Sequence, residues 1–183
     1  MQRTVLILFL FISFHCLAIK EKTQEAEGDS LSYRTFKFEK VTTLPGEPTE
    51  IYDAISGDIS EWWDHSFSKD PYKLFIEAKP GGGFYEYFNE QGDGVLHATV
   101  IAAQRGKLLR FDGPLGLSGL AVQIVTTYYF APAGNDSTEL KVEVHGAGEL
   151  TNKLPAIVEK VWEHFIFERF VPYVENRNKV RNE

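Results

Sequence analysis

The chain has 183 residues, 43% of them hydrophobic and 14% aromatic, and 26 acidic against 19 basic residues give a formal net charge of −7. A nucleic-acid-binding role is excluded, because it requires a basic face and no Lys/Arg cluster lies between Tyr33 and Tyr173. The single cysteine, Cys16, excludes an intrachain disulfide, so a hydrophobic core must stabilise the fold, which about 150 residues can supply.

Residues 1–18 are typical of a secretory signal peptide. A basic start containing Arg3 precedes the apolar run VLILFLFISFHCLA, and Ala18 is the small residue expected before a signal-peptidase cut. The run is too short to span a bilayer, so we expect cleavage without stable membrane insertion and an exported protein, periplasmic or extracellular. A lipoprotein with Cys16 at its mature N-terminus is the weaker alternative, since a histidine precedes that cysteine. A polar linker at 19–32 then leads to one domain.

That domain is predicted at 33–176, followed by a tail at 177–183. It begins with an alternating apolar and polar strand, YRTFKFEKVTTL. A helix starting at Glu47 or Thr49 follows and ends at Gly57 in a left-handed cap. A second short helix is predicted at 59–65 with Asp58 as its N-cap.

From residue 72 onward the sequence predicts six strands separated by short turns rich in Gly, Asn, Asp and Pro. They are YKLFIEA, GFYEYF, GVLHATVIAAQ, KLLRFDGP, AVQIVTTYYFAPA and STELKVEVHG. Short turns join antiparallel neighbours, so these strands form a meander. With the first strand they make a seven-stranded sheet.

The last segment, LPAIVEKVWEHFIFERFVPYVENRN, predicts a long helix with Pro155 in its first turn. Its apolar face shifts after Phe165, and Pro172 is expected to kink or end it. Residues 166–174 are then expected to bury a different surface, either a strand edge or a partner, which permits a homodimer.

Three consecutive glycines, Gly81 to Gly83, suggest a phosphate loop or a tight hairpin. A phosphate loop leads from a strand into a helix N-terminus, whereas these glycines lead from strand to strand. A hairpin is therefore predicted, with positive φ angles supplied by glycine and a close backbone approach at Gly83.

These segments together resemble the SRPBCC superfamily (START/Bet v 1-like, helix-grip), and within it the branch named after activators of a heat-shock chaperone ATPase. The matching segments are PTEIYDAISGDISEWW, EAKPGGGFYEYF, HATVIAAQRGKLLRF, TTYYFAPAGNDSTELKVEVHGAG and VEKVWEHFIFERFVPYV. The resemblance implies an α+β helix-grip fold: a curved antiparallel sheet wrapped around a long C-terminal helix, with an apolar cavity between them. It implies binding of lipids, hormones or polyketides, polyketide cyclisation, or chaperone regulation. The last does not suit an exported protein.

No metal, cofactor or catalytic residue is assigned from motifs. The histidines of the predicted domain are far apart and form neither an i, i+4 pair nor HExxH. They are His65, His97, His145 and His164. Glu143 and His145 are expected to face solvent. Ser118 in GLSGL lacks the second glycine of the GxSxG nucleophile motif and is interpreted as a turn residue.

The aromatic content favours an apolar small-molecule pocket, although the same side chains can fill a solid core. We expect the ligand-binding residues to be Trp62, Trp63, Glu86, Phe88, His97, Arg110, Tyr128 and Phe165. The first hypothesis is a noncatalytic binding protein for a lipid-like or polyketide-like ligand. The alternatives are a cyclase or hydrolase that uses His97 or Glu86 as acid or base, and a protein-interaction module that uses the end of the helix.

Overall fold

The computed structural model describes residues 30–182 of the chain. The predicted signal peptide, with Cys16, lies outside the described residues, as does most of the predicted linker. None of the helices within 30–182 combines the length and apolar character needed to cross a bilayer.

One antiparallel sheet of eight strands forms the body of the domain, in the order β1-β8-β7-β6-β5-β4-β3-β2. The strands are β1 (Ser32–Pro45), β2 (Gly57–Asp58), β3 (Lys73–Ile76), β4 (Gly83–Tyr87), β5 (Gly94–Gln104), β6 (Leu108–Gly113), β7 (Val122–Pro132) and β8 (Ser137–Leu150). The predicted meander is confirmed, because β2 to β8 are neighbours in chain order and β1 closes the sheet against β8. The prediction of seven strands missed β2, whose two residues pair with β3.

The first predicted helix is α1 (Pro48–Ile55), and Glu50 accepts a hydrogen bond from the Glu47 amide at 3.2 Å. Gly57 has the expected positive φ, 71°. The second short helix, predicted at 59–65, is wrong. The chain makes only one turn, in which the Trp63 amide donates to the Ile59 carbonyl. Asp58, the predicted N-cap, pairs with Phe75 as part of β2, and the Ile59 amide donates to the Leu74 carbonyl, so the chain is still bound to the sheet where the helix was expected to start.

The C-terminal helix runs through α2 (Leu154–Glu163), a π-helical segment η2 (His164–Phe170) and α3 (Val171–Asn182). Pro155 lies in the first turn as predicted. Pro172 does not end the helix, and α3 continues past the predicted boundary at 176. The wider turns of η2 immediately precede Pro172, and we attribute the tolerance of the proline to them, since an α-helical carbonyl at position 168 would collide with its ring.

The π-helical segment also explains the shift of the apolar face. Side chains buried at 158, 162, 166, 170 and 174 recur every four residues. In an α-helix of 3.6 residues per turn, that spacing drifts by about 40° per turn, and the wide turns of η2 offset the drift. Ile166, Phe170 and Val174 are therefore buried inside this chain, whereas Phe167 is exposed, and a homodimer through this end of the helix stays a prediction.

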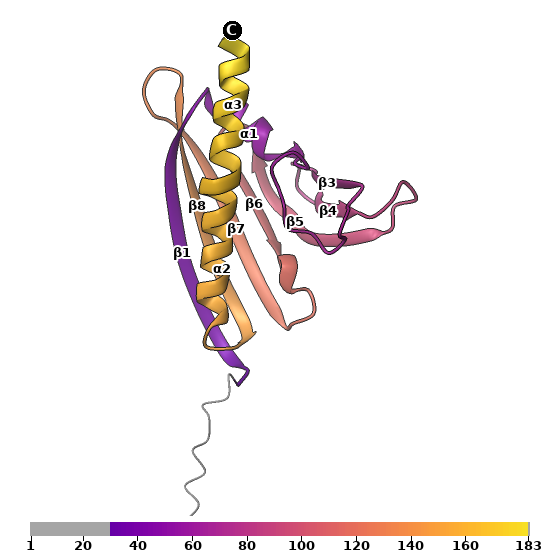
Figure 1. Cartoon of the computed structure of the whole chain (residues 1–183). Helices are drawn as coiled ribbons and strands as arrows, with labels where there is room; N and C mark the ends of the chain where they lie inside the picture. The colour runs from indigo at the N-terminus through magenta and orange to yellow at the C-terminus, as the bar shows by residue number, and fades with distance from the viewer. Residues whose placement is uncertain (1–29, 183) are drawn as a thin grey trace, which may run out of the picture.

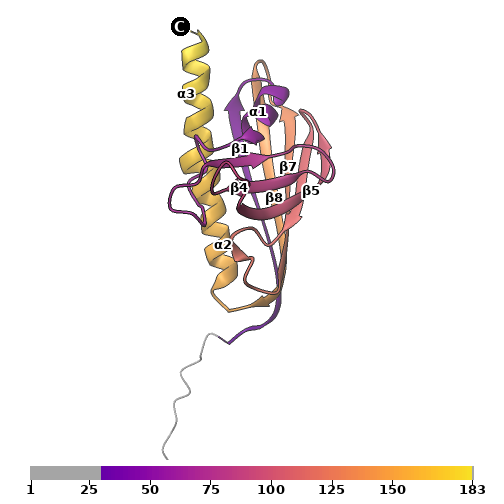
Figure 2. The same ribbon diagram turned by 90° about the vertical axis from the view of Figure 1, so that its right-hand side faces the viewer.

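The helix lies along one face of the sheet (Figure 1). Figure 2, turned by 90°, shows it to one side of the curved strands, so sheet and helix enclose the core between them. The core extends from Leu44 on β1 to Phe170 on the helix.

The predicted glycine hairpin is confirmed. Gly81 has a φ of 81°, its amide donates to the Val100 carbonyl, and the Val100 amide donates to the Gly82 carbonyl. A Cβ at Gly82 would lie 2.2 Å from the backbone oxygen of Glu77. The closest backbone approach is thus at Gly82, whereas at Gly83 a Cβ would meet the Tyr85 ring.

Replacing Gly82 with alanine is expected to lower the free energy of unfolding by about 1–3 kcal/mol, because backbone must move to make room. Gly119, with open space around its Cβ position and no positive φ, is the matched control and should tolerate alanine within about 0.5 kcal/mol. Urea unfolding of both variants tests this expectation, and equal stability of the two would contradict it.

Candidate ligand-binding site

A partly enclosed cavity of about 480 Å³ lies between the sheet and the C-terminal helix. Its walls are α2 and Phe165 of η2, the loop 63–67, the short 3₁₀ helix η1 (Leu115–Leu117) and inward side chains of the sheet. The lining residues from the sheet are Phe84 on β4, His97 on β5 and Ile124 on β7. Those from α2 include Leu154, Ile157, Val158, Val161 and Trp162.

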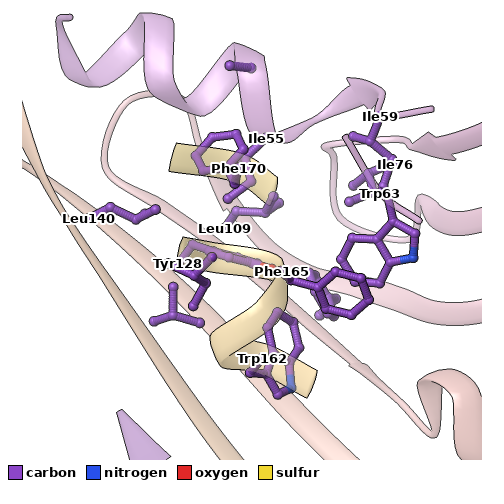
Figure 3. Packing of buried hydrophobic residues seen from close by; sticks show 14 of the residues in the cluster. Ile55, Ile59, Trp63, Ile76, Leu109, Tyr128, Leu140, Trp162, Phe165 and Phe170 are labelled. Atoms are coloured by element: carbon purple, nitrogen blue, oxygen red, sulfur yellow. The ribbon is translucent and has the colours of Figure 1, made fainter. Parts of the chain in front are cut away.

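Aromatic rings form one wall of this cavity. The rings of Trp63 and Phe165 stack with centroids 3.7 Å apart and an interplanar angle of 18°. Trp63 also meets Phe84 edge to face at 5.0 Å, and Trp162 meets Phe165 at 6.1 Å. Figure 3 shows Phe165 against the Trp63 indole, with Trp162 on the neighbouring part of the helix. The two stacked rings cover one face of each other, and the rest of their surface contributes to the apolar lining of the cavity.

The polar centre of the site is a buried pair formed by Glu86 on β4 and His97 on β5. Their side chains are 0% and 6% exposed, and His97 Nε2 lies 3.0 Å from Glu86 Oε2. The same carboxylate accepts hydrogen bonds from the Phe67 amide at 2.9 Å and the Ser68 amide at 2.7 Å. Glu86 therefore fixes both the imidazole and the loop that borders the cavity.

The predicted site residues divide into two groups. Trp63, His97 and Phe165 line the cavity, and Glu86 lies directly behind His97. The remaining four do not line it: they are Trp62, Phe88, Arg110 and Tyr128.

Each of those four has a physical reason for its position. Trp62 is a core residue that packs on Phe170 with ring centroids 4.9 Å apart. Tyr128 is fully buried, and burial raises its pKa well above the usual value near 10. Phe88 is exposed beyond the end of β4.

Arg110 points to the outer face of the sheet, because it alternates with Leu109 and Phe111, which are both fully buried. Its guanidinium donates to Thr127 Oγ1 at 2.8 Å. His145 is likewise exposed, as predicted for that part of β8.

Sequence reasoning missed the loop contributions, above all His65, Phe67, Leu115 and Leu117. Leu115 adopts a φ of 52°, which is rare for a branched side chain. The sequence did contain a signal for Leu115 and Leu117: they are apolar residues in a glycine-rich loop. An apolar side chain in a loop stabilises the fold only when it is buried.

A second polar cluster, which we call the rim cluster, borders the cavity at His65. It consists of Asp64, His65, His164, Glu168 and Arg169. Hydrogen bonds to Glu168 and Asp64 raise the pKa of His164 above its usual value. Burial raises the pKa of Asp64, but hydrogen bonds from His65 and His164 outweigh it, so this pKa lies below the usual value.

A larger groove of about 690 Å³ lies between α1 and α3. Its borders carry charged residues, and the ion pair between Arg181 and Glu50 joins them. It lacks the aromatic wall and the buried polar pair of the smaller cavity, which is therefore the candidate site.

Comparison with known proteins supports the architecture. No family model matches the chain, and no curated protein matches it. Among solved structures, it is similar to an uncharacterised protein from Rhizobium leguminosarum, with a TM-score of 0.58 and 14% identity over 80% of this chain and 98% of that one. It is also similar to a protein from Rhodobacter sphaeroides, with a TM-score of 0.55 and 14% identity over 81% and 99% of the two chains.

CalU16 from Micromonospora echinospora is a third similar structure, with a TM-score of 0.53 and 11% identity over 79% of this chain and 83% of that one. Identities this low establish the fold alone. The chain has an α+β fold of the helix-grip type, in which a curved antiparallel sheet packs on a long C-terminal helix.

Proposed function

We propose that this protein is a noncatalytic binding protein that encloses an apolar, aromatic small molecule between its sheet and its C-terminal helix. The observation that carries the proposal is the cavity of about 480 Å³, a volume typical of small-molecule sites, with an aromatic wall and one buried polar pair. Burial of ligand surface would supply most of the affinity, at about 25 cal/mol per Å² of apolar area.

The arrangement favours a flat ligand with one polar group. A planar ring can lie against the Trp63 and Phe165 wall, where aromatic contacts add about 0.5–1.5 kcal/mol beyond area burial. His97 Nε2 is held by Glu86, so in the neutral ring Nδ1 is left as an acceptor for a ligand hydroxyl. We propose a lipid-like or polyketide-like compound of this shape.

We further propose that the protein acts outside the cytoplasm, on the basis of the signal-like sequence at 1–18. The resemblance to the branch named after chaperone ATPase activators supports the proposed fold. Activation of a chaperone ATPase is not proposed for this chain.

The direct test is native mass spectrometry of the purified protein, followed by organic extraction. A copurified apolar molecule at near one-to-one ratio would support the proposal and identify the ligand class. Absence of any such molecule, together with no binding of naphthalene or polyketide dyes, would overturn it.

Replacing Val161 with tryptophan is expected to fill the cavity and weaken binding of a naphthalene dye by about tenfold or more, equivalent to about 1.4 kcal/mol. Val180, exposed on the same helix and outside the cavity, provides the matched control, since its replacement by tryptophan adds the same ring elsewhere. Fluorescence titration gives both affinities. Equal weakening in the two variants would show that the dye binds outside the cavity.

A second candidate, an enzyme of the cyclase or hydrolase kind, is favoured by the Glu86–His97 pair alone. A carboxylate that orients a histidine is an arrangement suited to general acid–base chemistry. Turnover of the extracted ligand that is lost in His97→Asn would establish this alternative, whereas unchanged ligand after prolonged incubation supports the binding protein.

A further inference from the structure

We propose that Asp64, His65 and His164 of the rim cluster form a binding site for a divalent transition-metal ion at the edge of the ligand cavity. The sequence contains no metal-binding motif at this site, because His164 is 100 residues from Asp64. The two residues come together only through the packing of the 63–67 loop on the helix. The inference is independent of the proposed ligand-binding function, since it can be tested with metal alone.

The three donor groups converge on a common point. Asp64 Oδ1 lies 3.0 Å from His65 Nδ1 and 3.0 Å from His164 Nε2, and one ligand atom from each residue lies within 4.8 Å of the others. A tetrahedral ion with bonds of about 2.0–2.1 Å holds its ligand atoms about 3.3 Å apart. The observed spacings of 3.0 Å are close to that value, but both imidazole nitrogens now hydrogen-bond to Asp64, so an ion would have to displace these hydrogen bonds.

The donor types define the class of ion. Two imidazoles and one carboxylate suit Zn²⁺ or Fe²⁺, and three protein ligands leave at least one coordination position for water or another molecule. His65 belongs both to this cluster and to the cavity lining, so an ion bound here would lie at the edge of the cavity.

Supporting hydrogen bonds orient the donors in the way known metal sites do. Glu168 Oε2 lies 2.8 Å from His164 Nδ1, which directs Nε2 toward Asp64. Arg169 Nε lies 3.2 Å from Asp64 Oδ2, which is also 2.9 Å from His164 Nε2, whereas Oδ1 lies 3.0 Å from both imidazoles. Apart from the imidazoles, Asp64, Glu168 and Arg169 give the cluster a formal charge of −2 + 1 = −1.

The loop that carries two of the donors is held in place. Trp63 Nε1 donates to the His65 carbonyl at 2.8 Å, and the Trp63 ring stacks on Phe165, the residue after His164. The ordering of the donors is thus supplied by the aromatic wall rather than by the ion. The same atoms also hydrogen-bond one another directly, so the experiment must separate an ion site from a purely hydrogen-bonded latch.

The experiment uses tag-free, chelator-treated full-length protein carrying Cys16→Ser, which removes the only thiol. Calorimetric titration with Zn²⁺ is expected to give one ion per chain, and Co²⁺ should give the visible absorption of a four- or five-coordinate complex. His164→Ala and His65→Ala should each weaken Zn²⁺ binding by about 100-fold, and Glu168→Gln by about tenfold, as expected for an outer partner.

His145→Ala, which removes an exposed histidine from β8, is the control and should leave Zn²⁺ affinity unchanged. His65 forms one exposed ion pair worth about 0–1 kcal/mol, so His65→Ala should remain folded even if His164→Ala does not. Lack of Zn²⁺ binding at about 1 mM, or an affinity unchanged in the folded His65→Ala protein, would overturn the proposal and leave a hydrogen-bonded latch.

Discussion

Replacing Glu86 with alanine is expected to lower the free energy of unfolding by about 3–5 kcal/mol, because this buried carboxyl group has three hydrogen-bond partners that would all lose it. The side chain is fully buried and accepts hydrogen bonds from the amides of Phe67 and Ser68 as well as contacting His97. Its removal leaves two backbone donors and an imidazole without their acceptor, and each unsatisfied buried group is costly.

Denaturant unfolding measures the loss, and hydrogen exchange locates it. The Phe67 and Ser68 amides should exchange faster in Glu86→Ala even under conditions that leave β7 and β8 protected. Glu86→Gln retains the shape and one acceptor oxygen, so its stability should be intermediate. Glu139, exposed on β8, supplies the control: its replacement by alanine should cost about 0.5 kcal/mol or less. Equal stability of Glu86→Ala and Glu139→Ala would refute a structural role for the buried pair.

Replacing Phe165 with alanine is expected to destabilise the protein by about 3–5 kcal/mol, the usual range for a buried phenylalanine. The ring stacks on Trp63, contacts Trp162 and lines the cavity. Its loss therefore removes packing contacts from the core and lining surface from the cavity at the same time. The affinity for a naphthalene dye should fall in parallel, because the ligand loses its stacking partner.

Phe167 is the matched control for this variant, since it lies on the same π-helical segment but is exposed. Phe167→Ala should cost about 0.5 kcal/mol or less and leave dye affinity unchanged. If Phe165→Ala remains folded and binds the dye as the unmodified protein does, Phe165 is not part of the site. Phe165→Leu tests packing without the ring and should recover stability more than affinity.

The Glu86 and Phe165 variants test the two sides from which the loop 63–68 is held. Glu86 holds the 66–68 loop from the sheet side, and Phe165 holds Trp63 from the helix side. The loop 63–68, whose residues line part of the cavity, is thus held from both sides. The rim cluster adds a third attachment, through His164 and Arg169 to Asp64. Access to the cavity should therefore depend on this loop more than on the sheet.

The sequence by itself determined the strands, the glycine hairpin and the existence of a long C-terminal helix. Alternation of apolar and polar side chains has a period of two in a strand, and short glycine-containing turns force antiparallel neighbours, so all seven predicted strands could be located without a structure. The same alternation could also have predicted that Arg110 points to the outer face of the sheet, because it lies between two buried neighbours.

Only the tertiary structure decided how the site is assembled. The π-helical segment that carries the buried stripe past Pro172 is a response to packing against the sheet, and local propensity gives no sign of it. The second short helix does not form because Asp58 and Ile59 pair with β3, a contact that no local pattern in the sequence specifies. His65 and His164 meet although 99 residues separate them, since contacts of that separation depend on the complete fold rather than on any local pattern.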